Sequence, residues 1–215
     1  MAIMLRISIL AIAMAAGMFG CGEREKAPPA AGYLPDDYDY ETYLSQTRSA
    51  CCSRIVNGSK SYDRETNDCG GEVCELTVQE MAKLVKSLSG RAVFVMIYQT
   101  SCPRSQAFFE ELIPLADELR DERHEFVVMA AGQDAEDADV FLDSRDPSFA
   151  RLRLLPWKSG DLGLALKSIN ISIGNSYAPP LIGVLDEQGF LVGSWDPAYY
   201  FDVPDIRAAI EGATG

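Results

Sequence analysis

Histidine is almost absent from this 215-residue sequence, in which His124 is the only one. It ends the run Asp121-Glu122-Arg123-His124, which we place at the end of a helix, where a positive charge is favourable. One histidine in that setting argues against a Ser-His-Asp triad and against a histidine-rich metal site. The sequence predicts no metal site and no cofactor.

Positive charge is also scarce. Lysine and arginine number 19 against 32 aspartates and glutamates, which gives a formal net charge of −13. A surface this acidic repels phosphate backbones, so we do not expect nucleic acid as a partner. It also argues against electrostatic attachment to anionic lipids. The sequence does not indicate an oligomeric state.

Long apolar runs are missing after the first twenty residues. Residues 7–19 are apolar apart from Ser8 and follow the charged Arg6, a pattern typical of a secretory signal and too short for a permanent membrane span. The run ends at Gly20-Cys21 and resembles the lipobox of bacterial lipoproteins. This resemblance implies that residues 1–20 are removed and that Cys21 carries a lipid anchor. An ordinary cleaved signal peptide with an incidental cysteine is the alternative.

The lipoprotein resemblance also implies a location. The protein would be anchored in the bacterial cell envelope and would face the periplasm. Gly22 stands where an aspartate favours retention in the inner membrane, which points to the outer membrane. Loss of Arg6 with the signal peptide would make the mature chain one charge more negative.

Two segments precede the folded domain. Residues 21–49 lack sustained periodicity and are interpreted as a flexible linker. Residues 50–76 are polar, rich in turns and short of core residues, so disulfide bonds would have to hold them. We expect two bonds within this segment, in which adjacent Cys51 and Cys52 each reach Cys69 or Cys74. Zinc is the alternative, although the spacings are poor matches to zinc ribbons.

Residues 77–215 are expected to form one α/β domain. Thr77 and Glu80 form a capping-box pattern that opens a helix closed near Gly90. Apolar runs at 92–98 and 126–131 predict strands buried on both faces.

The rest of the domain follows the same alternation of patterns. A second helix runs from near Cys102 through Leu119 and is expected to kink at Pro114. Residues 147–177 are ambiguous apart from a helical pattern near 162–169. Strands at 181–185 and 190–195 form a hairpin, and a closing helix spans 204–210. Helix–strand alternation predicts a parallel sheet with helical crossovers.

Cys102 is the candidate nucleophile. It lies in Cys102-Pro103-Arg104-Ser105, between a predicted buried strand and a predicted helix. Unpaired N–H groups and the positive dipole end of a helix start stabilise a thiolate, which is the form that attacks disulfides. We therefore expect Cys102 to be nucleophilic, accessible and free.

The strand-turn-helix around Cys102 resembles the thioredoxin-like superfamily, with Ser105 in place of the second cysteine of Cys-x-x-Cys. A second motif, Pro180 followed by five strand residues and Asp186-Glu187-Gln188-Gly189, resembles the family's cis-proline strand. The membrane-anchored thioredoxins of the TlpA type are the comparison. The resemblance implies a thioredoxin-like fold, a central mixed sheet with flanking helices. It also implies that Pro180, or less favourably Pro179, is a cis proline beside Cys102.

The motif departs from the family in ways that bear on activity. Ser105 cannot resolve a mixed disulfide, and Met96 stands where the family often has a buried aspartate as proton carrier. If Pro179 precedes the cis proline, one N–H that normally binds a peptide is missing. A peroxiredoxin is a weaker alternative, because Gln99 and Val95 replace its expected threonine or serine and proline.

The residues support two functional hypotheses. The preferred one is monothiol thiol-disulfide exchange on exported proteins through Cys102, with Ser105 and Pro180 completing the site. The other is a redox-inactive binding module that docks a partner protein. An inert cysteine in a decayed site fits the second hypothesis. A third possibility is that Cys102 pairs with an upstream cysteine, which makes the Cys-rich segment a resolving arm.

Overall fold

The computed structural model describes residues 52, 74–119, 121–131, 140–141, 152–157, 160–172, 179–195 and 203–215. The expected signal peptide 1–20, lipidated Cys21, linker 21–49 and Cys51 and Cys69 lie outside these residues.

Six strands and four helices have defined bounds in this part of the chain. In chain order they are β1 (Cys74–Leu76), α3 (Val78–Ser87), β2 (Ala92–Tyr98), α4 (Pro103–Leu119), β3 (His124–Ala131), β4 (Leu152–Leu154), α6 (Asp161–Ser168), β5 (Leu181–Leu185), β6 (Leu191–Trp195) and α7 (Val203–Gly212).

The strands form one mixed sheet in the order β1-β4-β3-β2-β5-β6. The first four strands of that order are parallel, whereas β5 runs antiparallel to β2 and pairs with β6 as a hairpin. Every residue of β2, β3 and β5 is buried except the first of β3, as expected for strands covered on both faces.

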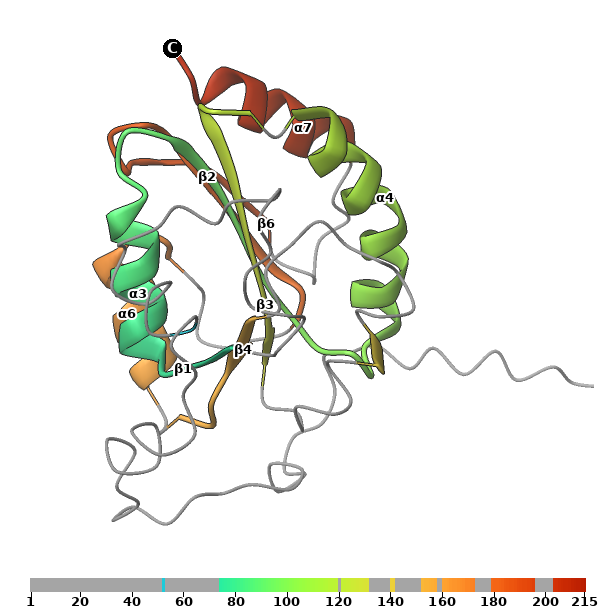
Figure 1. Cartoon of the computed structure of the whole chain (residues 1–215), viewed down its shortest axis with the longest axis vertical. Helices are drawn as coiled ribbons and strands as arrows, with labels where there is room; N and C mark the ends of the chain where they lie inside the picture. Colours follow the sequence, from blue (N-terminus) through green and yellow to red (C-terminus); the bar gives the residue numbers. More distant parts are fainter. Residues whose placement is uncertain are drawn as a thin grey trace, which may run out of the picture.

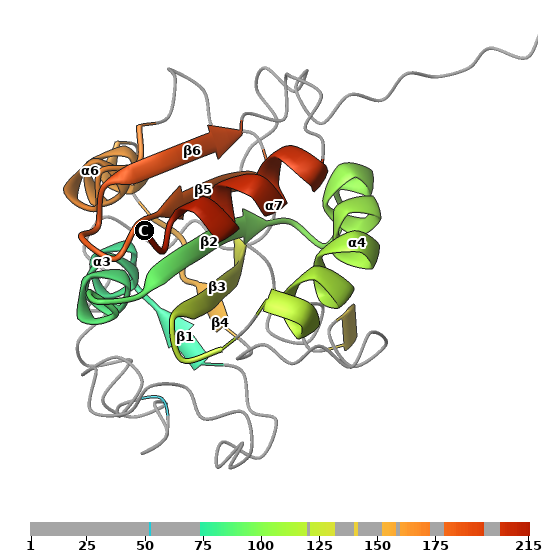
Figure 2. The same cartoon turned by 90° about the horizontal axis from the view of Figure 1, so that it is seen from above.

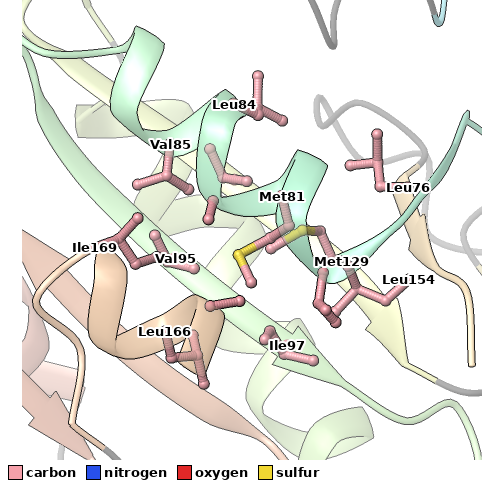
Figure 3. Close-up of a cluster of buried hydrophobic side chains, with 14 of the residues drawn as sticks. Leu76, Met81, Leu84, Val85, Val95, Ile97, Met129, Leu154, Leu166 and Ile169 are labelled. Carbon is pink, nitrogen blue, oxygen red and sulfur yellow. The ribbon is translucent and has the colours of Figure 1, made fainter. Parts of the chain in front are cut away.

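Helices cover both faces of the sheet (Figures 1 and 2). Helices α3 and α6 lie side by side on one face, and α4 and α7 lie on the other. Alternate residues of β2 enter the two cores that result. Val95 and Ile97 face α3 and α6, where Figure 3 shows them beside Met81 and Leu166. Met96 enters the second core, beneath α4 and α7.

Helix α3 begins where the sequence predicts. The Glu80 N–H donates to Thr77 Oγ1 at 3.2 Å, and the Thr77 N–H donates to Glu80 Oε2 at 2.9 Å. The capping box is therefore confirmed, and it satisfies two N–H groups that the helix itself leaves unpaired. Helix α4 runs through Pro114, whose side chain lies on the exposed side.

The structure extends the sheet beyond what the sequence predicts. Strand β1 takes Cys74 to Leu76 from the segment interpreted as Cys-rich, and Cys74 and Leu76 both belong to the core beneath α3. Strand β4 lies within the stretch that the sequence left ambiguous. Both strands have three residues, which is too short for a period-two pattern to register.

His124 is not at a helix end, so that expectation is wrong. It is the first residue of β3, which begins two residues earlier than predicted. Its neighbour Glu125 is buried, and Arg91, which directly precedes β2, donates from Nη1 to Glu125 Oε2 at 3.1 Å. This partner, distant in sequence, lets an acidic residue enter a buried strand.

Candidate active site around Cys102

Cys102 lies at the N-terminus of α4, at the carboxyl end of the central strand β2. Its carbonyl accepts the N–H of Gln106 at 3.0 Å, which is the first backbone bond of the helix. Pro103 follows at the first helical position, where its missing N–H costs nothing. The predicted strand-turn-helix is therefore confirmed, with the sulfur placed at the positive end of α4.

The turn from Gln99 to Cys102 is held by one hydrogen bond of its own and by two side chains from the first turn of α4. The Cys102 N–H donates to the Gln99 carbonyl at 3.1 Å, and Gln106 Nε2 donates to the Thr100 carbonyl at 2.7 Å. The Gln99 N–H donates to Ser105 Oγ at 3.4 Å, a longer and weaker contact. The first turn of α4 thus holds the peptide groups on the N-terminal side of Cys102.

The Pro179–Pro180 peptide bond is cis, so the expectation of a cis Pro180 is confirmed. The Pro179 carbonyl oxygen lies 3.5 Å from Cys102 Sγ, although 77 residues separate the two in sequence. Leu181, which follows, pairs with Ile97 of β2, and this pairing carries the two prolines to the cysteine. Because Pro179 has no N–H, the backbone of this residue before the cis proline offers only an acceptor.

The structure contradicts the expectation that Cys102 is a free, accessible thiol. Cys102 is disulfide-bonded, and only 4% of the residue is exposed. The only other described cysteines, Cys52 and Cys74, are bonded to each other, so the partner lies outside the described residues. The expectation of a free thiol failed because disulfide connectivity cannot be derived from sequence. Ser101, Pro103 and Arg104 are exposed, so the sulfur lies close to the surface.

Cys52 and Cys74 form a disulfide with a Cα–Cα distance of 5.2 Å, one of the pairings that the sequence left open. Cys74 begins β1 and Cys52 is buried in the same core, so the bond ties the upstream segment to the edge of the sheet. A disulfide sulfur is not a thiolate, so these two cysteines are not zinc ligands in this state, contrary to the zinc alternative.

Ser105 stands where the thioredoxin-like resemblance implies a resolving cysteine, and it is completely buried, with 0% exposure. Met96, also completely buried, lies in β2 where the family often has an acid. Among the described residues the only buried acid is Glu125. It pairs with Val93 near the start of β2, whereas Cys102 follows the end of that strand. The described part of the site therefore holds neither a second thiol nor a carboxylate proton carrier.

His124 and Asp121 form a separate cluster at the start of β3. Asp121 Oδ1 accepts the N–H groups of Arg123 and His124 at 2.7 and 2.9 Å and lies 2.8 Å from His124 Nδ1. Burial raises the pKa of Asp121, but these hydrogen bonds outweigh it and hold the pKa below its ordinary value.

On the surface, the hydrogen bond from Arg207 of α7 lowers the pKa of Glu118 of α4.

Sequence reasoning missed Gln106 and Thr100, whose contact closes the turn before Cys102. A glutamine in a first helical turn has no characteristic pattern. The one available signal is its position four residues after the cysteine, which places the two on the same helix face.

Among the described residues, no helix combines the length and the apolar character that a membrane span requires. No family model matches this chain, and no curated protein does.

Solved structures do resemble the chain. A thiol:disulfide interchange protein of the thioredoxin family from Chlorobium tepidum TLS aligns at 17% identity and a TM-score of 0.50, over 60% of this chain and 84% of that one. A putative thiol:disulfide interchange protein DsbE from Chlorobium tepidum aligns at 16% identity and a TM-score of 0.47, over 61% and 85%. A putative thioredoxin from Neisseria meningitidis aligns at 14% and 0.46, over 59% and 76%.

At these identities the likeness concerns the fold alone. The mixed sheet, the helices on both of its faces and the first of these alignments together establish that the chain has a thioredoxin-like fold.

Proposed function

We propose that this protein carries out thiol-disulfide exchange through Cys102 on exported proteins, as a lipid-anchored component of the bacterial cell envelope. The observation that carries the proposal is a disulfide-bonded sulfur at the start of α4, 3.5 Å from the carbonyl that precedes a cis proline. The thioredoxin-like resemblance implies these same elements around an active sulfur. Substrates are exported proteins that bear thiols or disulfides.

The exchange is monothiol within the Cys-x-x-Ser motif, because Ser105 has no sulfur. A Cys102 thiolate attacks a substrate disulfide, forms a mixed disulfide and releases the other substrate sulfur as a thiolate, which takes a proton. The upstream cysteine that pairs with Cys102 then attacks Cys102 Sγ and releases the second substrate thiol. Two electrons pass to the substrate, the Cys102 disulfide re-forms, and a dithiol protein of the envelope must reduce it again.

Three cysteines are possible partners of Cys102, namely Cys21, Cys51 and Cys69. A lipid attached to the sulfur of Cys21 excludes that cysteine from a disulfide. Cys51 is peptide-bonded to Cys52, so its Cα lies within about 3.8 Å of the Cys52 Cα, which is itself 5.2 Å from that of Cys74.

The sheet register gives part of the distance between Cys74 and Cys102. Cys74 pairs with Leu152, Leu152 with Met129, and Met129 with Ile97, five residues before Cys102. Three strand spacings amount to roughly 14 Å between Cys74 and Ile97, and the five residues from Ile97 to Cys102 add to this distance. Cys69 is separated from Cys74 by five residues of chain, about 17 Å when extended. This longer tether gives Cys69 a wider range of positions than Cys51, so we propose Cys69 as the resolving cysteine of a lipidated chain.

Mixed-disulfide trapping tests the proposal in envelope extracts of cells that express the full chain. Cys69→Ser should leave Cys102 bonded to exported proteins, because the resolving thiol is missing. The further change Cys102→Ser should abolish those complexes, and Ser101→Ala, an exposed neighbour, serves as the matched control. Trapping in Cys51→Ser instead would reassign the resolving cysteine. Absence of complexes from all single variants would refute exchange.

A redox-inactive binding module is the second candidate. It is favoured by the burial of Cys102, by Ser105 in place of a second thiol in the motif and by the absent N–H of Pro179. In that case a partner should co-purify non-covalently with wild-type protein and equally with Cys102→Ser. Mass spectrometry of the N-terminal peptide tests the lipid anchor, and membrane fractionation tests the outer-membrane location.

A further inference from the structure

The turn before Cys102 has an organisation that the Cys-x-x-Ser motif does not explain. Four of its backbone groups, the carbonyls of Gln99, Thr100 and Cys102 and the N–H of Cys102, take part in hydrogen bonds of 2.7–3.1 Å. Two of these bonds come from a single residue, Gln106, whose N–H holds the Cys102 carbonyl while its side-chain amide holds the Thr100 carbonyl.

From this arrangement we infer that Gln106 is a positioning residue for the sulfur of Cys102, an inference that rests on the proposed exchange function. The side-chain bond at 2.7 Å is shorter than the two backbone bonds at 3.0 and 3.1 Å, and it joins the helix to the peptide two residues before the cysteine. The helix can stabilise a Cys102 thiolate only while the sulfur stays over its N-terminal end, since the dipole effect falls off within one turn.

Ser105 contributes less than Gln106 to holding the turn before Cys102. Its hydroxyl accepts the Gln99 N–H at 3.4 Å, a distance at which a hydrogen bond is weak. A serine that replaces the second cysteine therefore does not by itself hold the turn. Gln106 is exposed, so its amide forms this bond in competition with water rather than in a dry core.

Loss of the Gln106 side-chain bond should therefore lower the reactivity of Cys102 while leaving the stability of the fold nearly unchanged. Removing the Gln106 amide removes its bond to the Thr100 carbonyl at little cost in folding, because Gln106 is exposed and Thr100 is partly exposed. The turn then samples positions in which the sulfur leaves the helix end, and the thiolate population falls. One exposed hydrogen bond of this kind corresponds to a change of about 3- to 10-fold in a local equilibrium.

Site-resolved labelling of the full chain measures this effect. Protein equilibrated in a glutathione buffer that opens the Cys102 disulfide is pulsed with 2,2′-dithiodipyridine, and the tryptic peptide 92–104 reports Cys102 alone. Gln106→Met has a similar length without the donor and should slow labelling about 3- to 10-fold. Gln79→Met, at an exposed position of α3, is the matched control for the chemical change.

A second variant separates positioning from general damage. Gln106→Glu has the same shape, but its ionised carboxylate cannot donate, whereas its protonated form can. Its labelling rate should be low at neutral pH and should approach the wild-type rate below about pH 4, where a glutamate is protonated. Glu110, one turn further along α4, is unchanged in every variant, so it cannot account for a difference between them.

Two results would overturn the inference. One is a wild-type labelling rate in Gln106→Met, and the other is a slowed rate matched by a drop in melting temperature beyond that of Gln79→Met. The assay probes the sulfur with a small disulfide, so it gives its answer whether or not exported proteins exchange with Cys102. Failure of the proposed function would instead appear as an absence of trapped protein complexes with labelling unchanged.

Discussion

The Cys52–Cys74 disulfide gives the sharpest stability prediction, because it closes a defined loop onto an edge strand. The change is the double substitution Cys52→Ala and Cys74→Ala in a Cys102→Ser background. That background removes the other disulfide from the comparison. Both sulfurs are buried in the core beneath α3, and the bond joins residues separated by 22 positions.

The magnitude follows from chain entropy. A loop of this length loses about 11 cal/mol/K in the unfolded state when it is closed, or about 3.4 kcal/mol at 25 °C. Loss of the bond should therefore lower the free energy of unfolding by about 3 kcal/mol, a large part of the 5–15 kcal/mol typical of a domain. At this domain size the melting temperature should fall by roughly 10 °C.

Urea denaturation followed by far-ultraviolet circular dichroism measures the loss, with Cys102→Ser alone as the reference. The m-value should rise at the same time, because the unfolded chain without the cross-link exposes more surface. A loss below about 1 kcal/mol would refute the entropic reasoning. It would show that the segment before β1 is confined in the unfolded state by something other than this bond.

Three further predictions concern single sites. Ser105→Cys should place a thiol in the buried resolving position, where it forms a disulfide with Cys102, and non-reducing peptide mapping should then find the original partner of Cys102 released. Gly183→Ala should cost about 1–3 kcal/mol, because a Cβ there would lie 2.9 Å from Ile171 Cδ1. Adding Ile171→Val, which removes that carbon, should recover part of the loss in urea denaturation. Because the pKa of Asp121 is lowered in the folded state, its contribution is present at neutral pH and is lost as the pH falls through the folded-state pKa. Asp121→Asn should therefore flatten the decline in stability below about pH 4, and unchanged curves would contradict the role of its hydrogen bonds.

Local signals predicted the parts of the fold that local interactions determine. The capping box of Thr77 and Glu80 fixed the start of α3, and continuous apolar runs gave the bounds of β2 and β5. The cis Pro180 followed from a motif resemblance. In each case the decisive residues lie within a few positions of one another.

Features that depend on distant partners escaped prediction. β1 and β4 are three-residue strands that exist because they pair with each other and because β4 also pairs with β3. Glu125 enters a buried strand because Arg91 neutralises it from 34 residues away. The contact between Cys102 Sγ and the Pro179 carbonyl joins residues that are 77 positions apart. No sequence pattern identifies the disulfide partner of Cys102.

The disulfide at Cys102 changes what the cysteine count predicts. If Cys21 carries a lipid, five cysteines remain, and the bonds of Cys52–Cys74 and of Cys102 use four of them. The odd thiol is then Cys51 or Cys69 rather than Cys102. If Cys21 carries no lipid, six cysteines can form three bonds, and no thiol is left over. Titration of the denatured, unreduced full-length mature protein with a thiol reagent should therefore find one thiol per chain when the N-terminal peptide is acylated. An acylated chain with no free thiol, or one whose free thiol maps to Cys102, would contradict the pairing on which the exchange mechanism depends.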